Sequence, residues 1–206
     1  MGWTRIAHAA APCVPSVKTD SGPFYPEGEI PTTSDLVSLP GHDRRASGQV
    51  IHVEGTVYDR ACKPLPGASV VIWQADTRGL YRHSKGGDQD ALDPHFGYFA
   101  RAITDQDGRY HFRTLVPASY RYAGLQRAPH IHIALSHGRG GKRQKLVTEI
   151  YFSGEQDDKL RARDRVYASR PAKSRHRLIA AKKPAPRSVA KNDPGALACR
   201  FDMRLP

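Results

Sequence analysis

Residues 50–75 read VIHVEGTVYDRACKPLPGASVVIWQA, and they hold two alternating, β-branched segments on either side of a turn. Side chains of a strand alternate between two faces, so this pattern predicts β-strands over 50–59 and 68–75. The proline- and glycine-rich RACKPLPG between them predicts the turn. The stretch therefore indicates a fold built from short β-strands.

The same signals recur along the rest of the chain and predict five more strands, at 98–105, 109–115, 130–136, 145–152 and 198–205. The QDG turn at 106–108 predicts that the strands on either side of it form a hairpin. No long helical period and no internal repeat interrupts this series. Seven short strands separated by turns indicate an all-β domain, either a β-sandwich or a barrel.

The 206 residues are enough for one domain with additions. Residues 1–48 are rich in Pro, Gly, Ser and Thr and predict an extended N-terminal arm, followed by the β domain at 49–206. No apolar run approaches the ~18 residues that a membrane-spanning helix needs, so no membrane partner is expected. The N-terminal MGWTRIAHAAAPC lacks a leucine-rich core, which predicts a cytoplasmic protein without a signal peptide.

The three cysteines, Cys13, Cys62 and Cys199, form no CxxC motif, so a zinc ribbon or a redox pair is not expected. They are interpreted as unpaired thiols in a reducing compartment. The net charge is +12, and much of the excess lies in residues 161–191. A solvated loop is the favoured interpretation of that segment, and a basic nucleic-acid-binding protein is kept as an alternative.

The segment YRYAGLQRAPHIH, residues 120–132, carries the first chemical signal. His130 and His132 are spaced i, i+2, so in a strand they share one face while Ile131 faces the core. Two imidazoles on one face can coordinate a metal ion, although two histidines on an exposed strand face would give the same pattern. No carboxylate is placed to complete a two-histidine-one-carboxylate triad.

Tyrosines gather near these histidines instead of carboxylates or cysteines. Tyr120 and Tyr122 lie just upstream, and Tyr81 occurs in GLYRH. A phenolate is a hard anionic oxygen donor, and a metal cation can hold a coordinating phenol in its ionised form near neutral pH. Two phenolates and two imidazoles around Fe(III) would form a charge-matched catalytic site.

Several stretches, taken in order, resemble the intradiol ring-cleavage dioxygenases of the protocatechuate 3,4-dioxygenase type. They are DSGPFYP at 20–26, VEGTVYDRACKPLPGASVVIWQADTRGLYRH at 53–83, LDPHFGYFARAITDQDGRYHFRTLVPASY at 92–120, RAPHIHIALS at 127–136, TEIYFSGE at 148–155 and RFDMRL at 200–205. No single piece is decisive, but the ordered set is specific. The resemblance implies a transthyretin-like (prealbumin-like) Greek-key β-sandwich with long loops.

The resemblance also implies roles for individual residues. The non-haem Fe(III) ligands would be Tyr81, Tyr120, His130 and His132; the catalytic residues Arg127 and Tyr120; and the substrate-binding residues Tyr122, Glu149, Gly22 and Pro23. Arg127 would stabilise negative charge on the activated substrate. Glu149 stands where the family often has a glutamine, and its charge would repel a carboxylated catechol unless a basic partner offsets it.

The implied reaction joins a catechol-type substrate and O2, with ring opening between the two hydroxylated carbons to a muconate-type dicarboxylate. Tyr120 would leave the iron and accept a catechol proton. The family also implies a homo-oligomer. The alternative is a non-catalytic transthyretin-like binding module, which could share GTVYD and PLPGASV but would not need the four ligands together.

Overall fold

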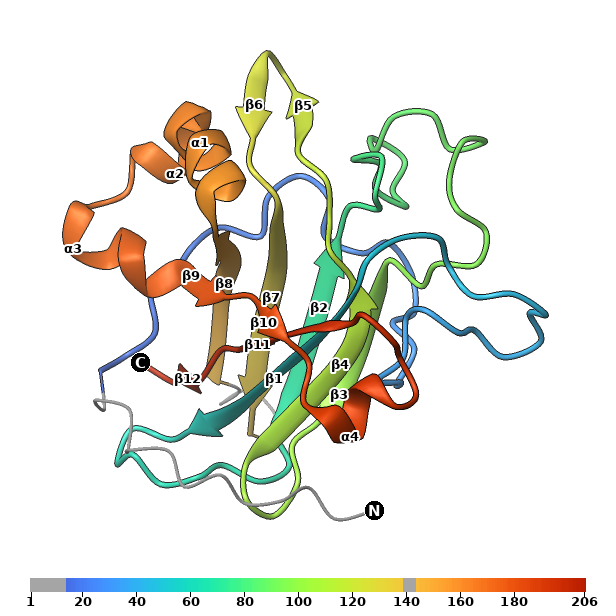
Figure 1. Ribbon diagram of the computed structural model, residues 1–206. Coiled ribbons are helices and arrows are strands. Elements are labelled where there is room, and N and C mark those ends of the chain that lie inside the picture. Colours follow the sequence, from blue (N-terminus) through green and yellow to red (C-terminus); the bar gives the residue numbers. More distant parts are fainter. Residues whose placement is uncertain (1–13, 139–143) are drawn as a thin grey trace.

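The computed structural model of the chain describes residues 14–138 and 144–206. One sheet has the order β3-β2-β7-β8-β9, with strands at Phe99–Ile103, Ser69–Gln74, His130–His137, Gln144–Ser153 and Ile179–Ala181. Figure 1 shows its long strands running through the middle of the molecule. Apart from one parallel pair, β8 with β9, its strands are antiparallel.

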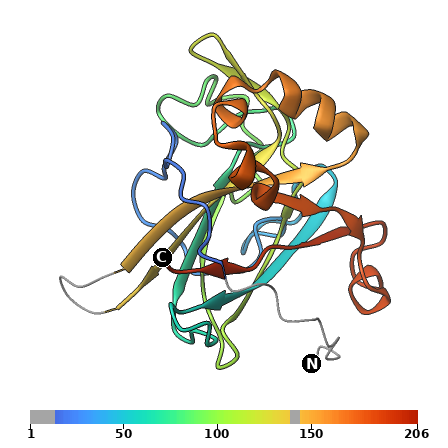
Figure 2. The same ribbon diagram turned by 90° about the vertical axis from the view of Figure 1, so that its left-hand side faces the viewer.

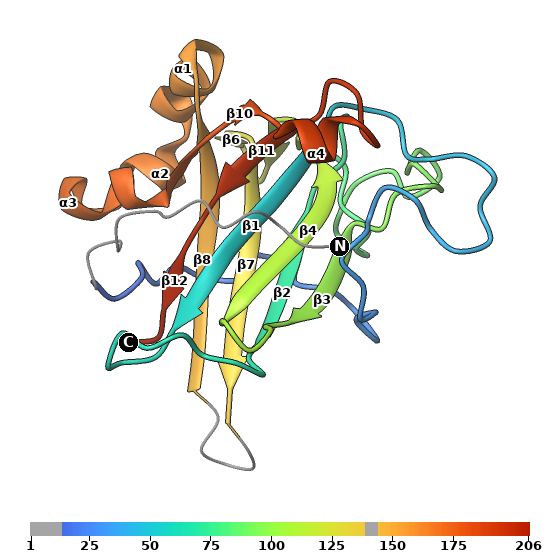
Figure 3. The same ribbon diagram turned by 60° about the horizontal axis from the view of Figure 1, so that its bottom comes forward.

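The second sheet is centred on β1 (Val50–Tyr58). β4 (Arg109–Leu115) pairs antiparallel with β1, while β11 (Leu197–Arg200) and β12 (Met203–Arg204) pair parallel with it. β10 (Lys183–Pro184) extends this sheet beyond β11. Figure 3 shows the β1–β4 sheet lying across the sheet that contains β7 and β8. The two sheets are open at their edges, which confirms the predicted all-β domain and agrees with a sandwich.

The core lies between these sheets and follows from strand alternation. Ile131 and Ile133 of β7 are fully buried in one cluster with Ile51 and Val53 of β1. Burying a side chain of this size contributes about 1.5–3 kcal/mol. Because one face of β7 fills the core in this way, His130 and His132 are directed to the opposite face, as the i, i+2 spacing predicts.

The predicted hairpin around 106–108 is wrong. The turn is present, and the amide of Gly108 donates to the carbonyl of Asp105. However, β3 pairs with β2 in one sheet and β4 pairs with β1 in the other. The QDG turn therefore carries the chain from one layer to the next, and it does not join neighbouring strands.

The interpretation of residues 161–191 as a solvated loop is also wrong. The segment from 155 contains helices α1 (Glu155–Arg163), α2 (Arg165–Ala168), α3 (Ala172–Arg175) and α4 (Arg187–Ala190), together with the 3-10 turn η2 (His176–Leu178). Asp164, between α1 and α2, is completely buried. Figures 1 and 2 show α1–α3 at the same end of the molecule as the hairpin of β5 (Tyr120–Tyr122) and β6 (Leu125–Arg127). Within the described ranges, no helix is long and apolar enough to cross a bilayer.

The described part of the N-terminal arm runs over both sheets. The amide of Thr19 donates to the carbonyl of Val147 in β8, and the amide of Leu36 donates to the carbonyl of Arg113 in β4. The arm therefore packs against the domain along its length, while the domain boundary at residue 48 stays a prediction.

The cysteines differ from the interpretation as unpaired thiols. Cys62 is disulfide-bonded, which corrects that interpretation. Cys199 is a free, buried thiol. Cys13 lies outside the described residues.

Candidate metal centre

Four side chains predicted as metal ligands meet at one end of the sandwich, although they come from three separate segments. Tyr81 lies in the loop after β2, Tyr120 begins β5, and His130 and His132 begin β7. Ring centroids lie 5.2 Å apart for the two tyrosines, 5.6 Å for Tyr120 and His130, and 4.7 Å for the two histidines. All four side chains are buried. The structure therefore brings the whole predicted ligand set together.

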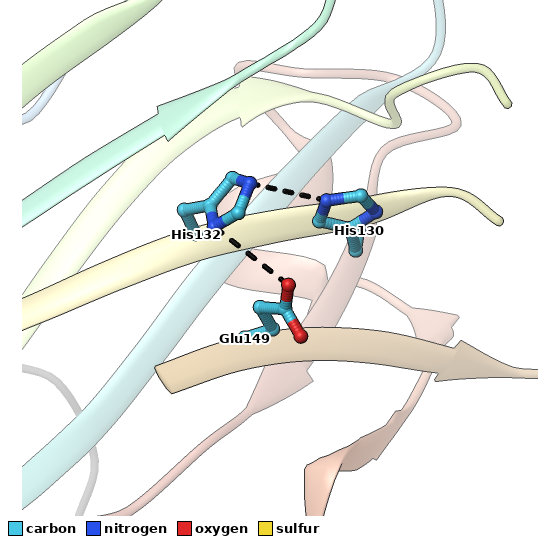
Figure 4. A group of neighbouring side chains, drawn as sticks. All are labelled: His130, His132 and Glu149. Atoms are coloured by element: carbon cyan, nitrogen blue, oxygen red, sulfur yellow. Dashed lines mark hydrogen bonds and ion pairs between the residues drawn. The ribbon is translucent and has the colours of Figure 1, made fainter. Parts of the chain in front are cut away.

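The two histidines point one nitrogen each at the same place. His130 Nε2 lies 3.2 Å from His132 Nε2, as Figure 4 shows. Since His130 Nδ1 lies 2.7 Å from the Ala128 carbonyl, which can only accept, Nδ1 carries the hydrogen and Nε2 presents a lone pair. Burial and the neighbouring His132 lower the pKa of His130 well below its ordinary value. Burial, Arg127 and Arg170 lower the pKa of His132 to about 3. Both rings are thus neutral at pH 7, as metal binding requires.

His132 is fixed from two sides. The indole ring of Trp73 in β2 stacks on it with the ring centroids 4.9 Å apart and the planes 3° from parallel. On the other side, a Cβ atom at Gly22 would lie 3.2 Å from His132 Cε1. Only a glycine leaves ordinary space for the imidazole here, which explains why the arm residue Gly22 belongs to the site.

The buried hydroxyl groups of the two tyrosines require a partner that the protein does not fully provide within the described residues. Tyr81 is buried, and within the described residues its hydroxyl has no hydrogen-bond partner. Burial and the nearby Tyr120 raise the pKa of Tyr81 well above its ordinary value. Burial likewise raises the pKa of Tyr120, although Arg127 opposes the shift. A cation between these oxygens and the imidazole nitrogens would meet the requirement and hold the phenols ionised. The donor set therefore fits Fe(III).

Arg127 links the tyrosines to buried carboxylates. Its guanidinium donates over 3.4 Å to the Tyr120 hydroxyl and over 3.0 Å to the Tyr151 hydroxyl. It also pairs with Glu149 at 3.1 Å and with Asp164 at 3.2 Å. Burial by itself would lower the pKa of Arg127, but these neighbours raise it overall. A permanent positive charge is thus held next to a predicted ligand.

Glu149 corrects the expectation that no carboxylate accompanies the histidine pair. It lies directly across from His132 in the β7–β8 register, and its ligand atom and those of His130 and His132 all lie within 4.8 Å of one another. Figure 4 shows its carboxylate facing the Nδ1 side of His132, away from the point shared by the two Nε2 atoms. Burial raises the pKa of Glu149, while Arg170 and Arg127 oppose that shift.

The sequence interpretation missed four residues of this site. Phe24 stacks on Tyr81 with ring centroids 4.5 Å apart, and Trp73 covers His132. Asp164 and Arg170 come from the segment interpreted as solvated loop. Phe24 and Trp73 lie inside the family-like stretches and could have been found there. No local pattern marks Asp164 or Arg170.

A cavity of about 480 Å³ opens beside the two tyrosines. Its aromatic lining includes Tyr81, Tyr120 and Tyr122, and Arg78, Lys85 and Arg121 give its lining a basic character. Phe24 of the arm also lines it, whereas Pro23 is only partly buried beside Phe24. The cavity is thus aromatic beside the tyrosines, and none of the described residues that line it carries a carboxylate.

Comparisons with known proteins agree with this arrangement. The profile of the family described as "Dioxygenase" matches residues 21–206. The protocatechuate 3,4-dioxygenase beta chain of Burkholderia cepacia is 35% identical over 76% of this chain and 66% of its own length. Catechol 1,2-dioxygenase of Acinetobacter baylyi is 32% identical over 67% of this chain and 46% of its own length. The chain thus spans about half to two thirds of the length of these curated relatives.

Solved structures give the same result. The dioxygenase domain of a carbohydrate-binding fusion protein from Streptomyces sp. SirexAA-E superposes with a TM-score of 0.62 at 27% identity, over 93% of this chain and 98% of that one. Catechol 1,2-dioxygenase from Acinetobacter sp. ADP1 superposes with a TM-score of 0.67 at 27% identity, over 91% of this chain and 62% of that one.

Proposed function

This chain belongs to the intradiol ring-cleavage dioxygenases, and from that premise we propose that it cleaves a catechol-type ring with O2 to a muconate-type dicarboxylate. One observation carries the proposal: Tyr81, Tyr120, His130 and His132 converge in a single buried site. A non-catalytic binding module of the same fold would have no use for a buried phenol that lacks a hydrogen-bond partner among the described residues and lies beside two neutral imidazoles.

We propose that non-haem Fe(III) is held by these two phenols and two imidazoles. Bound there, it would act as a Lewis acid toward the two oxygens of a catechol and keep the phenols ionised. Tyr120 would accept a catechol proton at its Oη atom, since a phenolate released from a cation is a base of high pKa. Arg127, 3.4 Å from that oxygen, would stabilise the negative charge that remains on the substrate.

The cavity supports a substrate with an anionic substituent. Arg78, Lys85 and Arg121 line it, and Tyr122 offers an aromatic edge for the ring. Glu149 is paired with both Arg127 and Arg170, so its charge is offset and does not oppose a carboxylate. Among protocatechuate, catechol and hydroxyquinol, the compounds in the names of the relatives, we therefore expect protocatechuate to be favoured.

We also propose a homo-oligomer, a cytoplasmic location and the Greek-key connections of a transthyretin-like sandwich. The family resemblance supports the homo-oligomer and the Greek-key connections, and the crossing between the layers after β3 also supports the latter. The cytoplasmic location rests on the N-terminal sequence alone, and the disulfide bond of Cys62 argues against it. Light scattering on the purified protein measures the oligomeric state directly.

The decisive experiment is the colour and iron content of protein produced with iron. Tyrosinate-to-iron charge transfer should make it wine-red, and Tyr120→Phe should change the absorption band and lower oxygen uptake by about 100-fold or more. Tyr58→Phe, in a partly buried position at the end of β1, is the matched control and should leave both unchanged. A colourless, iron-free protein would contradict the proposal, and oxygen uptake with the three catechols would rank the substrates.

A further inference from the structure

Arg170 reaches the metal centre from outside the sheets. It follows α2, and its guanidinium lies 2.6 Å from Glu149 Oε2. The Arg170 side chain is 14% exposed and that of Glu149 is 2% exposed. The Coulomb attraction in a contact this short and this well shielded from water is stronger than in an ion pair on the surface. The pair is thus a fixed part of the site.

The carboxylate of Glu149 lies between two guanidinium groups and one metal-ligand candidate. Arg127 donates to Oε1 over 3.1 Å, whereas Arg170 contacts the other oxygen, Oε2. The same Oε1 lies 3.9 Å from His132 Nδ1. Arg127, Arg170, Glu149 and Asp164 together contribute two positive and two negative charges. The cluster is therefore balanced, and the loss of any member would leave an uncompensated buried charge.

The two histidines differ in what their second nitrogen meets. His130 Nδ1 donates to the Ala128 carbonyl. His132 Nδ1 is buried and has no hydrogen-bond partner within the described residues. The metal-binding imidazole of a protein usually donates its other N–H to a carboxylate, a carbonyl or water, which sets the ring's orientation and strengthens it as a donor. Glu149, across the strand pair, is the carboxylate that faces this nitrogen.

We propose that, when a metal binds His132 Nε2, Glu149 Oε1 closes its 3.9 Å separation from His132 Nδ1 and accepts a hydrogen bond from it. Arg170 would then be a positioning residue that holds this carboxylate and sets the electrostatic potential at His132. The inference rests on the proposed function, because it assumes that His132 Nε2 binds the metal. It also gives the helical segment after β8 a function: through Glu149 and His132, Arg170 of this segment adjusts the electron density at the bound metal.

The test is a double-mutant cycle on iron-loaded protein, with Arg170→Gln, Glu149→Gln and the double variant. Losing Arg170 leaves more negative charge at His132, makes the iron richer in electrons and moves the tyrosinate-to-iron band to shorter wavelength. Losing Glu149 should move the band to longer wavelength. Since Arg170 acts through Glu149, Arg170→Gln should add little shift in the Glu149→Gln background.

Two control variants distinguish this electrostatic effect on the absorption band from a general disruption of the site. Arg165→Gln removes an exposed arginine of α2 and should leave the band in place. Arg170→Lys keeps the charge and should retain most of the wild-type band. Glu149→Gln should also release iron to a chelator about tenfold faster, which is a typical effect of losing such a partner. Band shifts that are equal in direction, or additive, would overturn the proposal.

Metal-free protein provides an independent measurement. Arg170→Gln should lower the melting temperature in the wild-type background and change it much less in the Glu149→Gln background, because the pair is already broken there. Equal losses in both backgrounds would overturn the pairing. If wild-type protein stays colourless with iron, the proposed function fails, whereas this cycle still tests the Arg170–Glu149 pair on its own.

Discussion

Gly22 shows at the scale of one residue how little space surrounds His132. Its φ angle is +67°, in the region that favours glycine, and an added Cβ would lie 3.2 Å from His132 Cε1. The position therefore requires glycine for two reasons, the left-handed backbone and the lack of space beside His132. Only the lack of space affects the metal ligand.

Gly22→Ala should separate these two effects. The left-handed backbone costs an alanine about 1–2 kcal/mol, so we expect a comparable loss in the free energy of unfolding. Because the new methyl group presses on His132, the iron-loaded protein should also show a weaker or displaced visible band. Gly28→Ala is the matched control, since Gly28 has a φ of +84° and nothing within 4 Å of an added Cβ. If both variants change the band equally, the steric argument is wrong.

The ligand residues were predictable from the sequence, whereas their support was not. His130 and His132 follow from strand alternation, and Tyr81 and Tyr120 follow from the ordered family-like stretches. Glu149 next to His132 depends on the register of β7 against β8, which spacing within one strand does not specify. The same holds for every contact that needs two segments to be aligned first.

At the scale of elements, the junction between α1 and α2 fixes the end of β6. Asp164 accepts hydrogen bonds from the amide of Tyr167, where it caps α2, and from the amide of Ala128. It also pairs with Arg127. One buried carboxylate thus joins the helical segment to the strand that carries the catalytic candidate.

Asp164→Ala should be strongly destabilising, because it leaves Arg127 short of a partner and two amides unsatisfied. Removing one member of a buried ion pair typically costs about 3–5 kcal/mol, which chemical denaturation would measure. Asp164→Asn keeps an acceptor oxygen for one of the two amides and should lose less. Glu155→Ala, which removes an exposed i, i+4 pair with Lys159, should change stability by no more than about 1 kcal/mol. A mild effect of Asp164→Ala would contradict the proposed link.

The strands were predictable to within a few residues, but their partners were not. Alternation predicts 50–59, 68–75 and 130–136, close to the observed β1, β2 and β7. A tight turn predicts a change of direction, and the QDG turn shows that the next strand can lie in the other layer. The basic segment after β8 has no clear amphipathic period, so its helices depend on tertiary contacts such as those of Asp164.

At the scale of the whole molecule, one end of the sandwich gathers the arm, the β5–β6 hairpin and the helices around the candidate metal centre (Figures 1 and 2). Neutral histidines with lowered pKa values, both at this end and in β4 of the other sheet, make the protein sensitive to acid in the absence of metal. Burial and His52 lower the pKa of His111 to about 4, and His130 and His132 are lowered as well.

Metal-free protein should therefore lose stability as the pH falls. The unfolded chain protonates its histidines near pH 6.5, while the folded chain takes up these protons only at lower pH. The unfolded state thus binds up to three more protons below about pH 6.5, and the melting temperature should fall from there toward about pH 4. His132→Gln should make this dependence less steep. A constant melting temperature over this range would contradict the depressed pKa values.

The pairing of β1 has a consequence for the order of folding. One side of β1 is covered by β4. Among the described residues, the strands that cover its other side are β11 and β12, through pairs such as Ile51 with Leu197 and Val57 with Met203. During synthesis this side has no partner until residues 197–204 have left the ribosome, and contacts so distant in sequence form slowly. We expect amides of β7 to gain protection from hydrogen exchange before those of β11 during refolding. The sheet that bears the histidines would then be built first, and the opposite sheet would be closed last.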